Sequence, residues 1–337
     1  MKDKTTHARD AKRYGERRSL ARRSGFTLVE LLTVITIIGM LSAISITTVR
    51  AAIQSAKETQ TRTTIAKLDS VMTAAYEKYQ YRRFEIDNYY NLSTRQRALV
   101  RVQKLRDLVR RDFPCTPNEL TDTAPSGVAS VDATPLQAAY QSEISRSKTG
   151  SLSSNPDIAN AELLYLVLTN VSPESRGSFA EREVADVDNN GLKEFVDGWG
   201  RPICWMRWAP GLERSDRQPY YDDARKEWNL ETLFSGATEM RFTNPGDAEP
   251  FDPMGVARGW FLVPYIYSAG TDGEYGLQTP EDCESLVGVD KMNNPFSVFW
   301  IDDMTLVSDS DLDLSRVIGY PRDKTYKDNI DNHTLVR

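Results

Sequence analysis

One acidic side chain, that of Glu30, lies inside an apolar segment that runs from Phe26 to Val49 without proline or any other charge. A carboxylate is costly in hydrocarbon, although less so near the end of a membrane helix, where it can reach the interface. The other interpretation requires a cut after Gly25, which would give Phe26 a free amine. Glu30 would then lie about one turn into the new helix, near the positive end of its dipole, and its carboxylate could pair with an amine of a neighbouring subunit.

A second group of oxygen-bearing side chains recurs at alternate positions in DVDNNGLKEFVD, residues 186–197. Its members are Asp186, Asp188 and Asn190, followed by Gly191, Glu194 and Asp197. Calcium takes six to eight oxygen ligands, and a D-x-[DN]-x-[DN]-G segment supplies three of them around a turn that glycine permits. An EF-hand loop has glutamate at its twelfth position, where this chain has the shorter Asp197. The segment is a candidate calcium loop, and an acidic Asn-Gly turn is the alternative interpretation.

The charge of the chain that carries these side chains is distributed unevenly between its N-terminal segment and the rest. Residues 1–25 hold nine lysines and arginines against three acidic residues, a net charge of +6, whereas the whole chain carries −6, so residues 26–337 carry −12. This asymmetry is typical of a membrane-targeted chain whose basic side stays cytoplasmic, with residues 50–337 outside. An acidic body would repel phosphate, so no nucleic acid is expected as a partner.

A single long helix is expected to follow the basic segment. Residues 26–49 would form about 36 Å of helix, enough to cross a bilayer core of about 30 Å. From Ile65 to Tyr79, apolar and aromatic side chains recur every three or four residues with charges between them, which is typical of an amphipathic helix. We therefore expect one helix over residues 26–80, membrane-spanning in its first half.

The remaining chain is expected to divide into an inserted region, residues 81–160, and a β-rich head, residues 161–337. In the inserted region, TRQRALVRVQKLRDLVRRDF predicts a second amphipathic helix, and the Ser-, Thr- and Pro-rich stretch from Pro114 to Pro156 predicts mostly loop. The arginines around this helix indicate either a solvated face packed on the body or a basic binding surface.

The head is expected to contain several apolar elements. They are a helix or buried strand at 161–170 and strands at 202–208, 260–268 and 296–301. Pro264 marks an edge or a break in the third of these segments. A long helix followed by strands predicts the α+β class, with a small antiparallel sheet packed on the outer half of the helix and with inserted helices and loops.

No recognisable catalytic pattern accompanies these elements. The two histidines are His7 and His333, and there is no phosphate-binding G-x-x-x-x-G-K-[ST] segment. Cys115, Cys204 and Cys283 lack the CxxC spacing of a structural zinc site; two of them could form a disulfide, but the sequence does not give the pairing. We expect a protein without enzymatic activity.

The residues RRSG followed by FTLVELL resemble the leader and processing site of type IV pilins and type II secretion pseudopilins. The resemblance implies that a prepilin peptidase cuts between Gly25 and Phe26 and that the new Phe26 amine is methylated. It also implies that Glu30 directs filament assembly by meeting this amine in a neighbouring subunit. Residues 1–25 are then a cleaved leader peptide.

Three C-terminal segments resemble the G-type major pseudopilin of type II secretion. They are DGWGRPI (197–203), YIYSAGTDGEYG (265–276) and KDNIDNH (327–333). In that family the middle segment is a calcium-binding loop, so the resemblance implies a second candidate calcium site at Asp272 and Asp328. The segments between them look like insertions.

Together these features predict a structural subunit of a type II secretion pseudopilus or type IV pilus-like filament, with calcium as an expected cofactor. The protein is expected to cross the inner membrane once, with its C-terminal domain extracytoplasmic. Its expected partners are other pseudopilins, the prepilin peptidase, the inner-membrane assembly platform and membrane lipid. The alternative is a membrane-anchored extracytoplasmic binding module for adhesion or DNA uptake.

Overall fold

The computed structural model describes two compact units, Met1–Ala52 and Ile53–Arg337. The described residues are 26–85, 89–120, 134–212, 221–222, 227–228, 262–287 and 316–334. The leader and the predicted strand at 296–301 lie outside these residues, as does the start of the predicted strand at 260–268.

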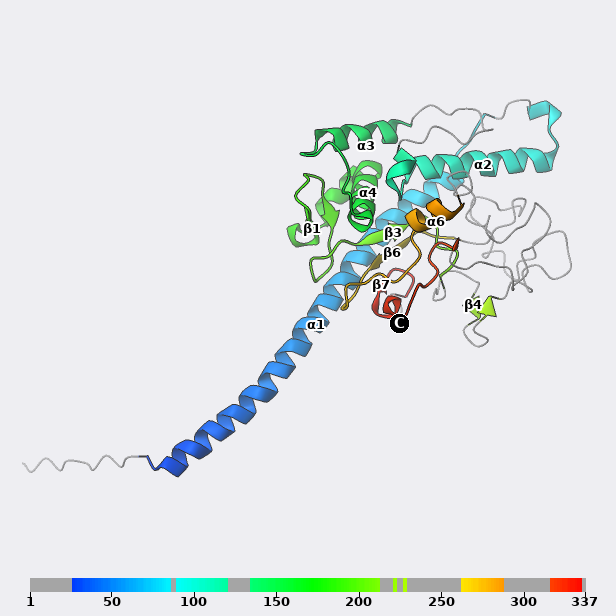
Figure 1. Ribbon diagram of the computed structural model, residues 1–337. Helices are drawn as coiled ribbons and strands as arrows, with labels where there is room; N and C mark the ends of the chain where they lie inside the picture. Colours follow the sequence, from blue (N-terminus) through cyan, green and yellow to red (C-terminus); the bar gives the residue numbers. More distant parts are fainter. Residues whose placement is uncertain are drawn as a thin grey trace, which may run out of the picture. The chain divides into compact units, whose positions relative to one another are not determined.

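Helix α1, Leu28–Gln80, is one continuous helix of 53 residues (Figure 1). Up to Ala52 its side chains are exposed. Among the described residues, α1 is the one helix that is long and apolar enough to cross a membrane. The hydroxyls of Thr36, Ser45 and Thr48 each donate to the carbonyl four residues earlier, at 2.7–2.9 Å. Because these bonds satisfy hydroxyls that would otherwise be costly in hydrocarbon, the inner half fits a single-pass membrane anchor.

The outer half of α1 is amphipathic, which confirms the sequence prediction. Its buried apolar side chains lie three or four residues apart and form part of the hydrophobic core; they are Ile65, Leu68, Met72, Ala75, Tyr76 and Tyr79. The hydroxyl of Tyr76 accepts a hydrogen bond of 2.7 Å from the indole Nε1 of Trp208, so the polar atom of this buried ring is also satisfied.

A three-stranded antiparallel sheet packs within the same unit. Its order is β3 (Cys204–Met206), β6 (Tyr265–Ser268) and β7 (Ile330–Asp331), with Cys204 opposite Tyr267 and Ser268 opposite Ile330. The central strand β6 is buried along its whole length and begins directly after Pro264, so it starts later than the predicted strand at 260–268, because proline cannot donate to a ladder. The fold is α+β and pilin-like, as the sequence predicts.

Two short antiparallel hairpins stand apart from this sheet. One pairs β1 (Val184–Ala185) with β2 (Glu194–Phe195), and the other pairs β4 (Tyr221–Asp222) with β5 (Glu227–Trp228). Helix α6 is Pro280–Val287. The 3₁₀ helices are η1 (Tyr89–Asn91), η2 (Pro117–Leu120), η3 (Pro173–Ser178), η4 (Glu181–Glu183) and η8 (Thr325–Asp328).

Helix α3, Pro135–Arg146, corrects the prediction that the stretch between Pro114 and Pro156 is mostly loop. The hydroxyl of Thr134 caps its first turn and Gln137 completes a capping box, while proline occupies a first-turn position, where its missing N–H costs nothing. The polar composition of this stretch suggests a loop, although its twelve helical residues follow an N-cap residue and include good helix formers.

The segment at 161–170, for which the sequence predicts either a helix or a buried strand, is part of helix α4, Pro156–Val171. It lies against β2, β3 and α3, and it is buried on most of its faces, which explains why its apolar residues show no clear helical period. The predicted boundary between inserted region and head, at residues 160 and 161, falls inside this helix.

Helix α2, Thr94–Asp112, confirms the predicted second amphipathic helix but not a basic surface along it. Arg106, Arg110 and Arg111 are 4%, 0% and 2% exposed, and Arg111 pairs with Asp107 at 3.2 Å. The C-terminal arginines of α2 therefore point into the body, whereas Arg95 near its start is exposed.

Candidate functional site

Glu30 lies in the first turn of α1, where it completes a capping box with Thr27. The Thr27 amide and hydroxyl donate to Glu30 Oε2 at 2.8 and 2.9 Å, and the Glu30 amide donates back to Thr27 Oγ1 at 3.2 Å. The T-x-x-E spacing of residues 27–30 is the sequence signal of this motif, and it could have predicted the capping box. The carboxylate therefore has a local role in starting the helix, besides any role between subunits.

The junction of Gly25 and Phe26 lies directly before this capping box. Gly25 is outside the described residues, and Phe26 is 85% exposed. A cut at this junction would place the new amine one residue before Thr27, at the N-terminal end of the helix, where the dipole disfavours a positive charge. An anionic partner close to this amine would therefore be stabilising, and Glu30 is the acidic residue of the first turn.

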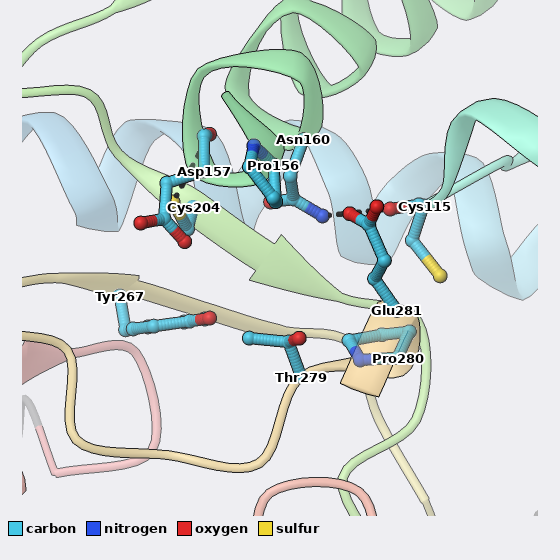
Figure 2. A pocket seen from close by; sticks show the side chains of 9 residues that line it. All are labelled: Cys115, Pro156, Asp157, Asn160, Cys204, Tyr267, Thr279, Pro280 and Glu281. Carbon is cyan, nitrogen blue, oxygen red and sulfur yellow. Dashed lines mark hydrogen bonds between the residues drawn. The ribbon is translucent and has the colours of Figure 1, made fainter. Parts of the chain in front are cut away.

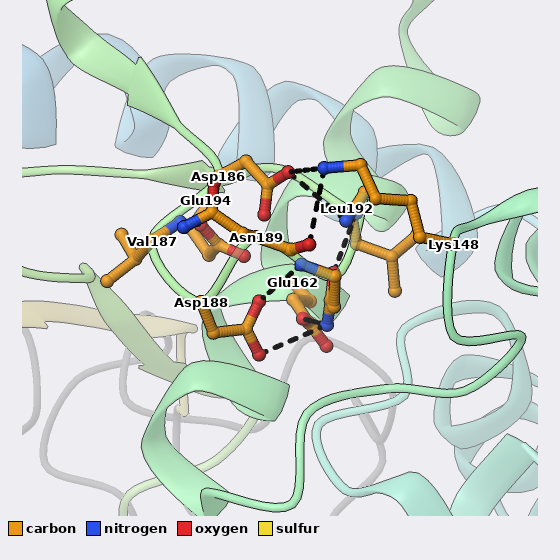
Figure 3. A network of polar contacts seen from close by, with 10 residues as sticks. Lys148, Glu162, Asp186, Val187, Asp188, Asn189, Leu192 and Glu194 are labelled. Carbon is orange, nitrogen blue, oxygen red and sulfur yellow. Dashed lines mark hydrogen bonds and ion pairs between the residues drawn. The ribbon is translucent and has the colours of Figure 1, made fainter.

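The candidate calcium loop connects β1 to β2 and brings three carboxylates together (Figure 3). One ligand oxygen from each of Glu162, Asp188 and Glu194 lies within 4.8 Å of the other two. Glu162, on α4, is separated from this loop by more than 20 residues, so sequence spacing could not find it. The loop turns through left-handed backbone at Asn189 and Gly191, with φ of 60° and 95°.

Burial, and to a smaller extent mutual repulsion, disfavours the ionised form of two of these carboxylates. Burial, and next the charges of Glu162, Asp188 and Asp186, raise the pKa of Glu194 to about 8, although a hydrogen bond from the Val187 amide opposes the shift. Burial is also the main reason that the pKa of Glu162 is raised. The ionised carboxylates are therefore unfavourable in this cluster unless a proton or a cation compensates their charge.

Asp186 and Asn190 lie beside the three carboxylates but bond mainly within the loop. Asp186 Oδ2 accepts from the Gly191 amide at 3.1 Å and from Lys148 Nζ at 3.5 Å. Asn190 Nδ2 donates to Glu162 Oε1 at 2.5 Å and to Asp188 Oδ2 at 3.2 Å, so its amide bridges two of the carboxylates.

Asp197, the predicted twelfth ligand, takes part in a different structure. Its Oδ1 accepts from the amides of Trp199 and Arg201 at 2.8 and 2.9 Å, and its Oδ2 accepts from Ser268 Oγ at 2.7 Å. Both oxygens thus hold the turn at residues 197–200 and join it to β6. The EF-hand spacing fails here because the chain leaves the loop after β2 and enters this turn.

The turn at residues 197–200 docks closely on the outer half of α1. The Gly198 amide donates to Thr61 Oγ1 at 2.9 Å, and the Trp199 indole donates to Gln54 Oε1 at 3.0 Å. A Cβ atom on Gly198 would lie 2.4 Å from the Lys57 carbonyl oxygen, so only glycine fits this approach.

We expect Gly198→Ala to lower the free energy of unfolding by about 1–3 kcal/mol, because the helix backbone or the turn must move to admit a methyl group. Urea unfolding of the full chain in detergent measures this change. Gly177→Ala is the matched control, since a Cβ there meets nothing within 4 Å. Equal loss in both variants would contradict the close approach.

Of the second candidate calcium residues, Asp272 lies in the loop after β6, and Asp328, the last residue of η8, bonds that loop. Asp328 Oδ2 accepts from the amides of Thr271 and Asp272 at 2.9 and 3.0 Å and from Thr271 Oγ1 at 2.7 Å. Burial opposes ionisation, but these hydrogen bonds outweigh it and hold the pKa of Asp328 below its usual value. The carboxylate organises the loop through hydrogen bonds, and calcium binding here stays a prediction.

A small cavity next to β3 does not extend the functional site (Figure 2). Its volume of about 10 Å³ admits no more than about one water molecule. Cys115 and Cys204 both line it, yet all three cysteines are free and buried, so the disulfide that the sequence left open is not formed. Burial raises the pKa of the Cys115 thiol to about 12, which makes it a poor nucleophile.

Comparison with known families finds a match that covers the predicted processing site. Residues 20–46 match the prokaryotic N-terminal methylation motif, the signal of type IV pilin and pseudopilin precursors, and the match includes Gly25, Phe26 and Glu30. No curated protein and no solved structure matches the chain. The motif supports a pilin-like precursor and implies processing by a prepilin peptidase and assembly into filaments, a structural rather than an enzymatic role.

Proposed function

We propose that residues 26–337 form a structural subunit of a type II secretion pseudopilus or type IV pilus-like filament. The observation that carries the proposal is the N-terminal methylation motif at residues 20–46, which coincides with the start of α1. A prepilin peptidase would cut between Gly25 and Phe26, and the Phe26 amine would be methylated. The subunit would then remain inserted in the inner membrane until an assembly platform adds it to the filament.

The inner half of α1 suits both environments of such a subunit. Its apolar side chains are exposed along the whole membrane-spanning window, so they can contact lipid before assembly and the helices of other pseudopilins afterwards. Between apolar helices, the unpaired Phe26 amine and Glu30 carboxylate would both be unfavourable, whereas a pair of them would be compensated. Assembly would therefore favour the register in which amine and carboxylate meet.

Within this class, we propose a G-type pseudopilin with large insertions, its C-terminal domain on the extracytoplasmic side. Contacts among the three C-terminal segments support this assignment. Asp197 accepts a hydrogen bond from Ser268, Arg201 Nη1 donates to Gly270 O at 2.9 Å, and Asp328 bonds Thr271. Segments that are far apart in the chain but resemble one family thus form one contiguous structure.

Replacement of the residue before the cut tests this proposal. We expect Gly25→Leu to leave the precursor uncut, because a branched side chain would occupy the site of a peptidase that recognises glycine. Immunoblotting of membranes, with mass spectrometry of the N-terminal peptide, measures the ratio of precursor to mature chain. Ser24→Ala is the control and should be processed as the unaltered chain is; equal processing of Gly25→Leu would contradict the proposal.

A further inference from the structure

We propose that Glu162, Asp188 and Glu194 bind one calcium ion that joins α4 to the β1–β2 hairpin. This site differs from the loop predicted by sequence spacing, since it takes a ligand from a helix and excludes Asp197. It does not rest on the proposed filament function, because it concerns the folded subunit alone.

The distances among the three carboxylates fit a shared ion. Calcium–oxygen distances are about 2.3–2.6 Å, so two ligands of one ion can be no more than about 5 Å apart. The ligand oxygens of Glu162, Asp188 and Glu194 all lie within 4.8 Å of one another. One ion can therefore contact all three without movement of the backbone.

An unpartnered buried oxygen independently points to a missing ligand. Glu194 is 0% exposed, and its Oε2 accepts from the Val187 amide at 2.8 Å, whereas its Oε1 has no hydrogen-bond partner. Asp186 Oδ1, on the same loop, is likewise buried without a partner. A buried carboxylate oxygen without a donor is strongly unfavourable, and a cation would satisfy it.

Lys148, the basic side chain that bonds this loop, contacts Asp186 rather than the three carboxylates. Lys148 Nζ contacts Asp186 Oδ2 at 3.5 Å and the Asn189 carbonyl at 3.2 Å, and its side chain is 65% exposed. A hard divalent cation with only oxygen ligands is the chemistry that this donor set favours. Asp188 is exposed and gives an ion access from solvent.

Binding at this position would stabilise a weak part of the fold. β1 and β2 contain two residues each, too few to be stable alone, and α4 lies against β2. The hairpin continues into the contact with α1, because the Val196 amide donates to the Glu183 carbonyl, and Glu183 pairs with Lys67 at 2.9 Å. Calcium would thus fix the hairpin against α4, and the hairpin in turn is joined to α1 through Glu183 and Lys67.

Calcium titration of the purified full chain in detergent, after removal of metal with chelator, tests the site. Calorimetry with calcium chloride should give one ion per chain, and calcium should raise the melting temperature. We expect Glu194→Gln to weaken binding at least about tenfold and to remove the thermal response. Without calcium, this variant should be no less stable than the unaltered chain, because the glutamine oxygen can still accept from the Val187 amide and the neutral amide places no charge in this buried position.

Three further variants keep the test decisive if Glu194→Gln fails to fold. Asp188→Asn changes an exposed ligand and should also lose binding, whereas Glu181→Gln, an exposed acid on the neighbouring η4, should retain it. Absence of binding at about millimolar calcium would overturn the proposal. So would unchanged affinity in Asp188→Asn, or loss of the site in Asp272→Asn alone, which would locate the ion in the loop after β6.

Discussion

Glu30→Gln is expected to lower the amount of subunit in filaments by roughly a factor of ten or more, while the chain still inserts and is cut. Glutamine preserves the capping box, because its side-chain oxygen can accept from the Thr27 amide as Glu30 does. It removes only the charge that would compensate the Phe26 amine of a neighbouring subunit in a low-dielectric environment. Quantitative immunoblotting of sheared filaments against the membrane fraction, in cells that hold the remaining assembly proteins, measures this ratio.

Thr27→Ala is the matched control for this experiment. It removes the hydroxyl that bonds both the amide and the carboxylate of Glu30 but leaves the charge in place. If the carboxylate acts between subunits, the alanine variant should assemble far better than Glu30→Gln. The reverse order, with normal assembly of Glu30→Gln and loss in Thr27→Ala, would show that the residue serves only to start the helix.

Arg207→Met is expected to be the most destabilising single change in the head, at about 3–5 kcal/mol. The Arg207 guanidinium donates to both oxygens of Glu119, at 2.9 and 2.6 Å, and to the Phe113 carbonyl at 2.7 Å. Both side chains are 2% exposed, so the substitution leaves a buried carboxylate without its partner. Urea unfolding of the full chain in detergent measures the loss.

The double variant Arg207→Met with Glu119→Gln separates the unpaired charge from lost packing. It should recover much of the stability, since neither charge remains buried. Burial alone would raise the pKa of Glu119, but the charge and hydrogen bonds of Arg207, together with the Arg110 charge and the Cys115 amide, outweigh it and lower the pKa below the usual 4.5. The contribution of this pair is therefore complete above about pH 4.5 and is lost as acid protonates Glu119, so the single variant should differ least from the unaltered chain in acid. Equal stability of Arg207→Met and the unaltered chain at neutral pH would contradict this account.

The sequence was most informative where a pattern is local and repeated. The apolar run and the three-to-four spacing from Ile65 to Tyr79 predict α1 almost to its ends, and β-branched and aromatic runs predict β3 and β6. Helix α3 was missed because its signal lies in capping residues rather than in apolar periodicity. The Arg207–Glu119 pair joins residues 88 positions apart and leaves no local trace.

The candidate sites divide in the same way. Gly25, Phe26 and Glu30 form a contiguous motif, so residue types and spacing suffice to propose their roles. The carboxylate cluster at the candidate calcium loop was only partly predictable, because the position of Asp188 and Glu194 is set by the turn but Glu162 comes from α4. Asp197 matched a spacing template, yet Ser268 and the turn at residues 197–200 engage both of its oxygens.

The mature N-terminus tests the central claim most directly. Mass spectrometry of the N-terminal peptide from membranes of the native cell should find a chain that begins at Phe26, with one methyl group on its amine. A chain that retains residues 1–25, or one that begins at any other residue, would contradict the account of a processed filament subunit.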